Sequence, residues 1–213
     1  MKILKQIAQC LEAGDDAAVP PLVSQALAEG LVAKIILDEG LIAGMNTVGE
    51  RFRIHEIFLP DVLLAARAMY AGMDILKPLL ISSGISSRGR VVIGSVQGDL
   101  HDIGKNLVGI MLKGAGFEVI DLGNDVGAEK FVAAAKDHGA LAIGMSALLT
   151  TTMPVMKEVV DRLKAEKLSD RIKTIIGGAP VSKGYADEIG ADAYGYDCAQ
   201  AVAGVKKLAE AVG

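Results

Sequence analysis

The sequence has few cysteines, few aromatic residues and no long uninterrupted apolar run. Cys10 and Cys198 are its two cysteines, too few and too far apart for a disulfide framework, so we expect free thiols in a reducing compartment. No apolar run approaches the roughly 20 residues that a transmembrane helix needs. Residues 1–6 lack the apolar segment of a secretory signal. These absences predict a cytoplasmic protein with no membrane partner.

Positive charge is also in short supply. Aromatic residues make up 4% of the chain, and the formal net charge is −4 with acids and bases interspersed. Such a surface offers neither a basic track for phosphates nor a stacking platform for bases, so we expect no nucleic-acid partner. By contrast, 51% of the 213 residues are hydrophobic and the mean hydropathy is +0.39. That composition excludes disorder and allows one large core or two modest ones.

Residues 1–81 show helical periodicity and almost no strand pattern. Gly40 and Gly44 lie one turn apart on one face of the third expected helix, so a neighbouring helix is expected to pack closely there. Four helices joined by short turns predict a small bundle, the first domain. The expected helices are Lys2–Glu12, Val19–Glu29, Val32 to about Arg51, and about Leu59 to Leu76.

From Val91 onward the chain alternates apolar strand-like runs with helical segments. Five such units predict a parallel, doubly wound sheet, and therefore an α/β domain over residues 90–213. The Ser- and Gly-rich stretch 81–90 is typical of a linker, and residues 82–90 are the candidate hinge between the two domains. The expected strands are Val91–Val96, Phe117–Leu122, Leu141–Ser146, Lys173–Ile176 and Ala193–Tyr194.

The loop after the first expected strand carries the most distinctive pattern of the chain. His101 has one carboxylate two residues before it, Asp99, and another directly after it, Asp102. An imidazole that ligates a metal through one ring nitrogen needs the other nitrogen hydrogen-bonded, most often to a carboxylate. Loops at the carboxyl ends of strands in an open α/β sheet are where ligands bind. The alternative is that Asp99 or Asp102 merely caps the helix that follows.

Two later strand ends extend this pattern. Ser146 ends the third expected strand, Leu148 follows it, and a run of small and hydroxyl side chains continues to Thr152. Gly177 and Gly178 follow the fourth strand. Taken alone, the threonines are typical of a helix cap and the glycines of a turn.

Together with Asp-x-His-x-x-Gly at 99–104, these spacings resemble the cobalamin-binding domain of methionine synthase and of the small corrinoid proteins of methyltransferase systems. The resemblance covers essentially the whole chain and implies a strand order of 2-1-3-4-5. It also implies that His101 is the lower axial ligand of cobalt, with Asp99 and Ser146 as a relay behind it. The other cofactor-binding positions that it implies are Gly98, Asp102, Ile103, Gly104, Leu148, Thr150, Gly177, Gly178 and Ala179.

The helical domain shares part of this resemblance. Residues 44–52, followed by Phe58-Leu59-Pro60, are similar to the cap that covers the upper, methyl-bearing face of cobalamin in methionine synthase. Phe52 and Leu59 would then be the apolar groups over the methyl ligand. Glu39 would contact the corrin, although its spacing to Met45 is one residue shorter than in that family.

The resemblance implies a methyl-carrying corrinoid protein that binds cobalamin or a related cobamide and cycles between methyl-Co(III) and Co(I). The chain would then be a subunit rather than a complete enzyme. Its expected partners are a methyltransferase that takes the methyl group from a small O- or N-methylated donor, a second methyltransferase that delivers it to tetrahydrofolate or a thiol, and a reductive activator of Co(II).

Two alternatives stay open at this point. One is the cobalamin-binding subunit of a mutase, which would lack this cap and need a large substrate barrel. The other is a cobalamin sensor, which would need a DNA-binding helix pair with a basic face. Residues 1–80 hold seven Lys and Arg against ten Asp and Glu, so they do not supply such a face.

Overall fold

The computed structural model describes residues 2–83 and 87–212, in which the chain divides into two compact units. The first is helical and comprises residues 1–87 with 114–116, and the second is α/β and comprises the remainder. Residues 84–86 of the expected linker and hinge lie outside the described residues, so that expectation stays a prediction. Both cysteines are free thiols. In the described ranges, no helix is long and apolar enough to cross a membrane.

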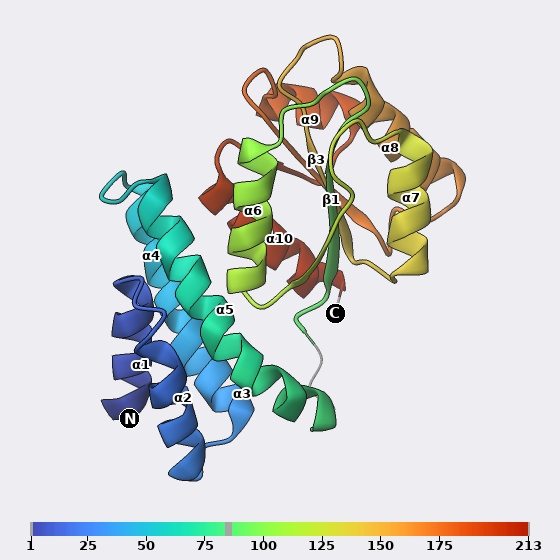
Figure 1. The fold of residues 1–213 in the computed structure, drawn as a ribbon. Helices are drawn as coiled ribbons and strands as arrows, with labels where there is room; N and C mark the ends of the chain where they lie inside the picture. Colours follow the sequence, from blue (N-terminus) through green and yellow to red (C-terminus); the bar gives the residue numbers. More distant parts are fainter. Residues whose placement is uncertain (1, 84–86, 213) are drawn as a thin grey trace. The chain divides into compact units, whose positions relative to one another are not determined.

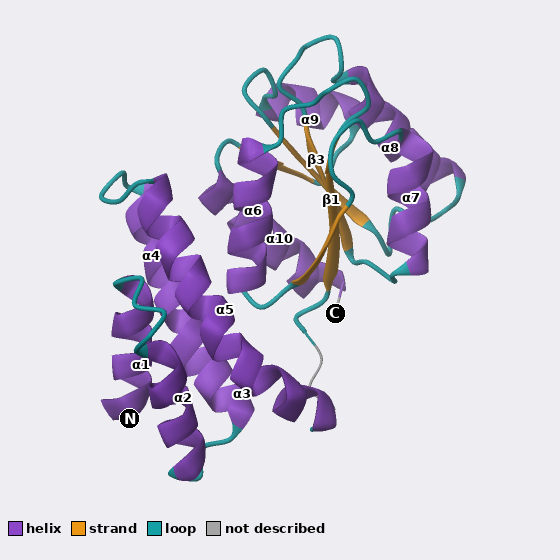
Figure 2. Ribbon diagram, viewed as in Figure 1, coloured by secondary structure: helices purple, strands orange, loops and turns teal. Residues whose placement is uncertain are grey.

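The first unit is built from helices (Figures 1 and 2). Its third expected helix is a continuous run with a π-helical middle, because Ile36 and Ala43 at the two junctions keep right-handed helical dihedrals. The close helix packing expected at Gly44 is confirmed: a Cβ there would lie 2.9 Å from the carbonyl oxygen of Ala8. The helices are α1 (Lys2–Glu12), α2 (Val19–Ala28), α3 (Ala33–Ile35), π-helix η1 (Ile36–Ile42), α4 (Ala43–Arg53) and α5 (Leu59–Ser82).

Helix α5 continues beyond its expected end at Leu76 and passes through Pro78 to Ser82. A proline inside a helix removes one main-chain hydrogen bond and usually breaks or kinks it. Leu80, in the turn after the proline, is nevertheless buried with 7% of its surface exposed, and burial of apolar surface favours the longer helix. The expected end at Leu76 and the assignment of residues 81–82 to the linker are therefore wrong.

The second unit is the expected doubly wound α/β fold. Its five strands are parallel in the order β2-β1-β3-β4-β5, which confirms the expected order. Helices α7 and α8 lie on one side of the sheet, with α6 and α10 on the other (Figure 1). The strands are β1 (Arg90–Ser95), β2 (Glu118–Asp121), β3 (Ala142–Ser146), β4 (Lys173–Gly177) and β5 (Ala193–Gly195), and the helices are α6 (Ile103–Gly114), α7 (Ala128–Asp137), α8 (Pro154–Ala165), α9 (Lys183–Ile189) and α10 (Cys198–Val212).

The register of the sheet places four strand ends side by side. Ser95 pairs with Ser146, Ser146 with Gly177, and Gly177 with Gly195. Each of these residues is the last of its strand. The loops that leave β1, β3, β4 and β5 therefore start from one line at the carboxyl edge of the sheet, which is the edge where open α/β sheets bind ligands.

The core under this edge is held by Phe131 of α7, which is fully buried. A Cβ on Gly94 in β1 would lie 2.8 Å from two ring carbons of Phe131. The absence of a side chain at Gly94 therefore leaves the space that the ring occupies. Protein interiors are close-packed, so loss of the ring would leave a cavity directly behind β1.

We expect Phe131→Ala to lower the free energy of unfolding by about 3–5 kcal/mol, because the substitution removes buried apolar surface and leaves a void. Urea unfolding of the protein without cofactor measures this change. The control is Lys130→Ala, which alters the exposed neighbouring position on α7 and should change stability by less than about 0.5 kcal/mol. Equal effects of the two substitutions would contradict this account of the core.

Candidate functional site

His101 is held by Asp99 in the loop between β1 and α6. One carboxylate oxygen of Asp99, Oδ1, accepts a hydrogen bond from the His101 main-chain N–H at 3.0 Å and lies 2.8 Å from the ring nitrogen Nδ1. Asp99 is fully buried, whereas 54% of the His101 side chain is exposed. A single oxygen thus fixes both the backbone and the ring of His101, of which the sequence predicted the contact with the ring.

The second oxygen of Asp99 is held by the loop after β3. Its Oδ2 accepts hydrogen bonds from the main-chain N–H groups of Leu148 at 2.6 Å and Leu149 at 3.2 Å. The hydroxyl of Thr152 lies 3.1 Å from the same oxygen and 2.8 Å from the Leu149 carbonyl oxygen, so its one hydrogen is shared between these two acceptors. Asp99 therefore joins the loop after β1 to the loop after β3.

The expected relay through Ser146 stays a prediction. In the described residues no hydrogen bond links the Ser146 hydroxyl to Asp99, and the hydroxyl that reaches Asp99 is that of Thr152. Ser146 is still part of β3, in register with Ser95, and its side chain faces a cavity instead. Thr152 reaches Asp99 because the chain turns back after Leu148, which sequence spacing alone did not reveal.

Asp99 also determines the tautomer of His101. Burial raises the pKa of the Asp99 carboxyl, but hydrogen bonds from Leu148, His101 and Thr152 outweigh burial and lower the pKa to about 2. An ionised carboxylate can only accept hydrogen bonds, so the proton between the two groups belongs to Nδ1 of His101. In the neutral ring the lone pair then lies on Nε2. This nitrogen is available to bind a metal ion, while Nδ1 has the carboxylate partner that metal-binding histidines need.

Ser95 holds His101 from the strand side. It is fully buried at the end of β1, and its hydroxyl donates to the main-chain carbonyl of His101 at 2.5 Å. His101 is thus fixed at its N–H, its carbonyl and its Nδ1, which leaves Nε2 as its unengaged ring nitrogen. The sequence pattern did not single out Ser95 for this role, because a serine at a strand end has no distinctive spacing.

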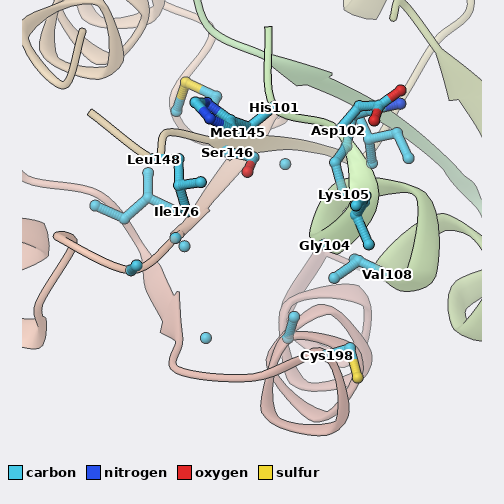
Figure 3. Close-up of a pocket in the computed structure, with 18 of the residues that line it drawn as sticks. His101, Asp102, Gly104, Lys105, Val108, Met145, Ser146, Leu148, Ile176 and Cys198 are labelled. Carbon is cyan, nitrogen blue, oxygen red and sulfur yellow. The ribbon is translucent and has the colours of Figure 1, made fainter. Parts of the chain in front are cut away.

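A cavity of about 720 Å³ opens beside His101 (Figure 3). Its walls come from α6, from the start of α10 and from the carboxyl ends of β1, β3, β4 and β5. The following predicted cofactor residues line it: His101, Asp102, Ile103, Gly104, Ser146, Leu148, Gly177, Gly178 and Ala179. Three other predicted residues of the α/β unit do not line it: Asp99 is buried behind His101, Gly98 lies in the turn before Asp99, and Thr150 is exposed in the loop after β3.

Other residues of this cavity were not predicted from the sequence. Val108 lies four residues after Gly104, on the same face of α6. Lys105 is buried, and its ammonium group contacts both carboxylate oxygens of Asp121 at 2.6 and 2.7 Å. Cys198 begins α10, where burial raises the pKa of its thiol to about 11, so it stays neutral. The general rule that ligands bind beyond the carboxyl ends of strands could have added the end of β5 to the expected site.

Glycines shape this cavity for a large ligand. A Cβ on Gly104 would meet no atom within 4 Å, so any side chain there would fill open cavity space. Gly178 has φ of +128°, and a Cβ would lie 1.9 Å from the Ala147 carbonyl oxygen; the backbone therefore requires glycine. The site offers one neutral nitrogen donor beside a roomy cavity with mostly apolar walls. These features fit a corrinoid, a large group whose metal would bind a nitrogen donor such as this one.

Three predicted cofactor-binding residues lie in the helical unit. Phe52 lies in the last turn of α4 and Leu59 is the first residue of α5, and both are partly buried. Glu39 is exposed on the π-helical turn η1. Their expected roles over the upper face of the cofactor stay predictions.

Comparison with known proteins agrees with this geometry. Residues 89–203 match the B12 binding domain family, and residues 3–77 match a second family that is also described as a B12 binding domain. A corrinoid protein of Desulfitobacterium hafniense is 44% identical over 98% of both chains. Dimethylamine corrinoid protein 1 of Methanosarcina acetivorans is 49% identical over 81% of this chain and 82% of that protein.

A solved structure gives the same result. The methanol:cobalamin methyltransferase complex of Methanosarcina barkeri contains a chain that is 31% identical, with a TM-score of 0.86 over 98% of this chain and 80% of that one. The chain belongs to the B12-binding corrinoid proteins of methyltransferase systems, and its cofactor is a cobalamin or a related corrinoid.

Proposed function

We propose that this protein carries a methyl group between two methyltransferases, one that takes it from a small O- or N-methylated donor and one that delivers it to tetrahydrofolate or a thiol. When bound, the corrinoid supplies a cobalt atom that can accept and release the methyl group. The observation that carries this proposal is the Asp99–His101 pair, which leaves Nε2 free beside a cavity large enough for part of the cofactor. The names of the relatives support a carrier over a mutase subunit or a sensor.

In this proposal His101 is the protein ligand of cobalt, and Asp99 and Thr152 hold its ring in one orientation. The cavity between α6 and α10 takes the displaced nucleotide tail of the cofactor, since its walls are mostly apolar and partly glycine. Phe52 and Leu59 cover the methyl group from the helical unit, and Glu39 contacts the corrin. A reductive activator restores the cofactor after oxidation, and the protein works in the cytoplasm.

The donor we favour is a methylated amine. Dimethylamine is named in the relative that shares 49% identity, whereas the complex named for methanol shares 31%. In this proposal substrate choice lies with the partner methyltransferase, because methyl groups from different donors would all be transferred to the same corrinoid.

We expect His101→Ala to change the visible spectrum of the cobalamin-loaded protein, because water would replace the imidazole below cobalt. The spectrum of the purified variant, loaded with hydroxocobalamin, measures this directly. His138→Ala, at the C-terminus of α7, is the matched control and should leave the spectrum unchanged. A His101→Ala spectrum identical to that of the parent would remove the central assignment.

Thr152→Val should weaken ligation by His101 by about 10-fold, since it removes a hydroxyl from Asp99 at nearly constant volume. Asp99→Asn should cost about 10-fold to 100-fold, because it changes the acceptor that holds Nδ1. Ser146→Ala should leave ligation by His101 intact. The ratio of ligated to unligated cobalt in the visible spectrum distinguishes these variants, and an effect of Ser146→Ala as large as that of Thr152→Val would support the expected relay.

Methyl transfer itself can be tested with the enzyme of a relative. The protein is loaded with hydroxocobalamin, reduced with titanium(III) citrate, and mixed with dimethylamine and the dimethylamine methyltransferase of Methanosarcina. We expect the spectrum to change from that of reduced to that of methylated corrinoid, and no change when dimethylamine is omitted. Parallel reactions with methanol and its own methyltransferase test the donor class, and methylation in neither reaction would contradict the proposed function.

A further inference from the structure

Asp125 has a backbone conformation that its position in the fold does not explain. Among the described residues other than glycine, positive φ angles occur at His55, Asp125 and Lys167. His55 and Lys167 each follow the last cap residue of a helix, α4 and α8 respectively, where a left-handed residue commonly ends the helix. Asp125, with φ of +54°, lies in the loop between β2 and α7 instead.

The contacts of Asp125 all point to the loop that bears His101. Its carboxylate Oδ1 accepts a hydrogen bond from the Gly98 main-chain N–H at 2.8 Å. Its own main-chain N–H donates to the Asp99 carbonyl at 3.1 Å. The left-handed conformation brings both groups of one residue to the same turn, and aspartate tolerates this conformation better than most residues. Asp125 therefore makes two hydrogen bonds to the Gly98–Asp99 turn.

Other residues of the β2–α7 loop also contact the loop after β1. Val96 and Val126 form a parallel bridge that extends the sheet by one step, with the Val126 N–H donating to the Ser95 carbonyl at 3.0 Å. The side-chain amide of Asn124 donates to the Leu100 carbonyl at 3.4 Å. The loop after β2 thus lies along the loop after β1, and Asp125 supplies its contacts to Gly98 and Asp99.

We propose that Asp125 is a positioning residue for His101, acting through Asp99. The carboxylate of Asp99 accepts hydrogen bonds from His101 through one oxygen and from the loop after β3 through the other. A small displacement of the Asp99 backbone would therefore break hydrogen bonds at one of the two oxygens. Asp125 fixes that backbone through two hydrogen bonds. Its carboxylate accepts from the Gly98 N–H, and its own N–H donates to the Asp99 carbonyl. This inference rests on the proposed role of His101 as the ligand of cobalt, and it adds a residue from a third loop to the site.

The test uses three substitutions at this position. Asp125→Asn keeps a side-chain acceptor and tolerates the left-handed conformation. Asp125→Gly tolerates the conformation but has no acceptor. Asp125→Ala lacks both properties. The proteins are produced with ¹⁵N-labelled histidine, loaded with hydroxocobalamin and reduced to cobalt(II), and the axial nitrogen is identified by its splitting in the electron paramagnetic resonance spectrum. The label separates a protein histidine from the base of the cofactor.

We expect the ratio of histidine-ligated to unligated cobalt to fall about 10-fold in Asp125→Gly, as for other changes behind a metal ligand, and to stay near the parent value in Asp125→Asn. Asp125→Ala should fall at least as far, and should it fail to fold, Asp125→Gly decides the result. Urea unfolding of each protein without cofactor shows that the Gly and Asn variants are folded. A parent-like ratio in Asp125→Gly, or an equal loss in Asp125→Asn, would overturn the positioning role. A parent protein with no signal from labelled histidine would instead overturn the proposed function, and this inference with it.

Discussion

The hydrogen bond between Asp99 and His101 is the interaction on which the rest of the site depends. A buried carboxylate without partners would take up a proton, because burial penalises its charged form. Here its two oxygens accept five hydrogen bonds, from His101, Leu148, Leu149 and Thr152, and stay ionised. The charge then dictates that the imidazole presents Nε2 rather than Nδ1 to the cavity. A single buried charge thereby selects the atom that binds cobalt in the proposed function.

The sheet topology makes this interaction possible. Strand β1 lies between β2 on one side and β3 on the other. β1 and β3 are therefore neighbours in the sheet, although α6, β2 and α7 separate them in sequence. Their last residues, Ser95 and Ser146, are in register. The loops that follow them must diverge above the same point of the sheet edge, where a ligand crevice forms. Asp99 bridges the two loops there, and the order of the strands is therefore a requirement of the site.

Sequence alone predicted the parts of this site that depend on local pattern. Short apolar runs alternating with helical segments marked the strands, and the spacing of Asp99 and His101 predicted their contact. The contact of the Thr152 hydroxyl with Asp99 was missed because it depends on the path of the backbone after β3, and that path depends on tertiary contacts with Asp99. The contacts of Ser95 and Asp125 were missed for the same reason, since their side chains bind main-chain groups of His101 and Gly98, and any residue at those two positions carries such groups. The end of α5 was missed because burial of Leu80 outweighs the local effect of Pro78.

These contacts engage some groups of His101 and leave one ring nitrogen free. Its backbone and Nδ1 are engaged by fixed groups of the fold, whereas Nε2 is left without a partner on a half-exposed ring. The conformational entropy of the loop is therefore lost when the protein folds and not when the cofactor binds. A ligand of this kind can leave a metal and return to the same position without reordering its loop. In the proposed function this property would suit a carrier whose cobalt binds His101 in one state and releases it in another, and the Asp99–His101 pair would supply it.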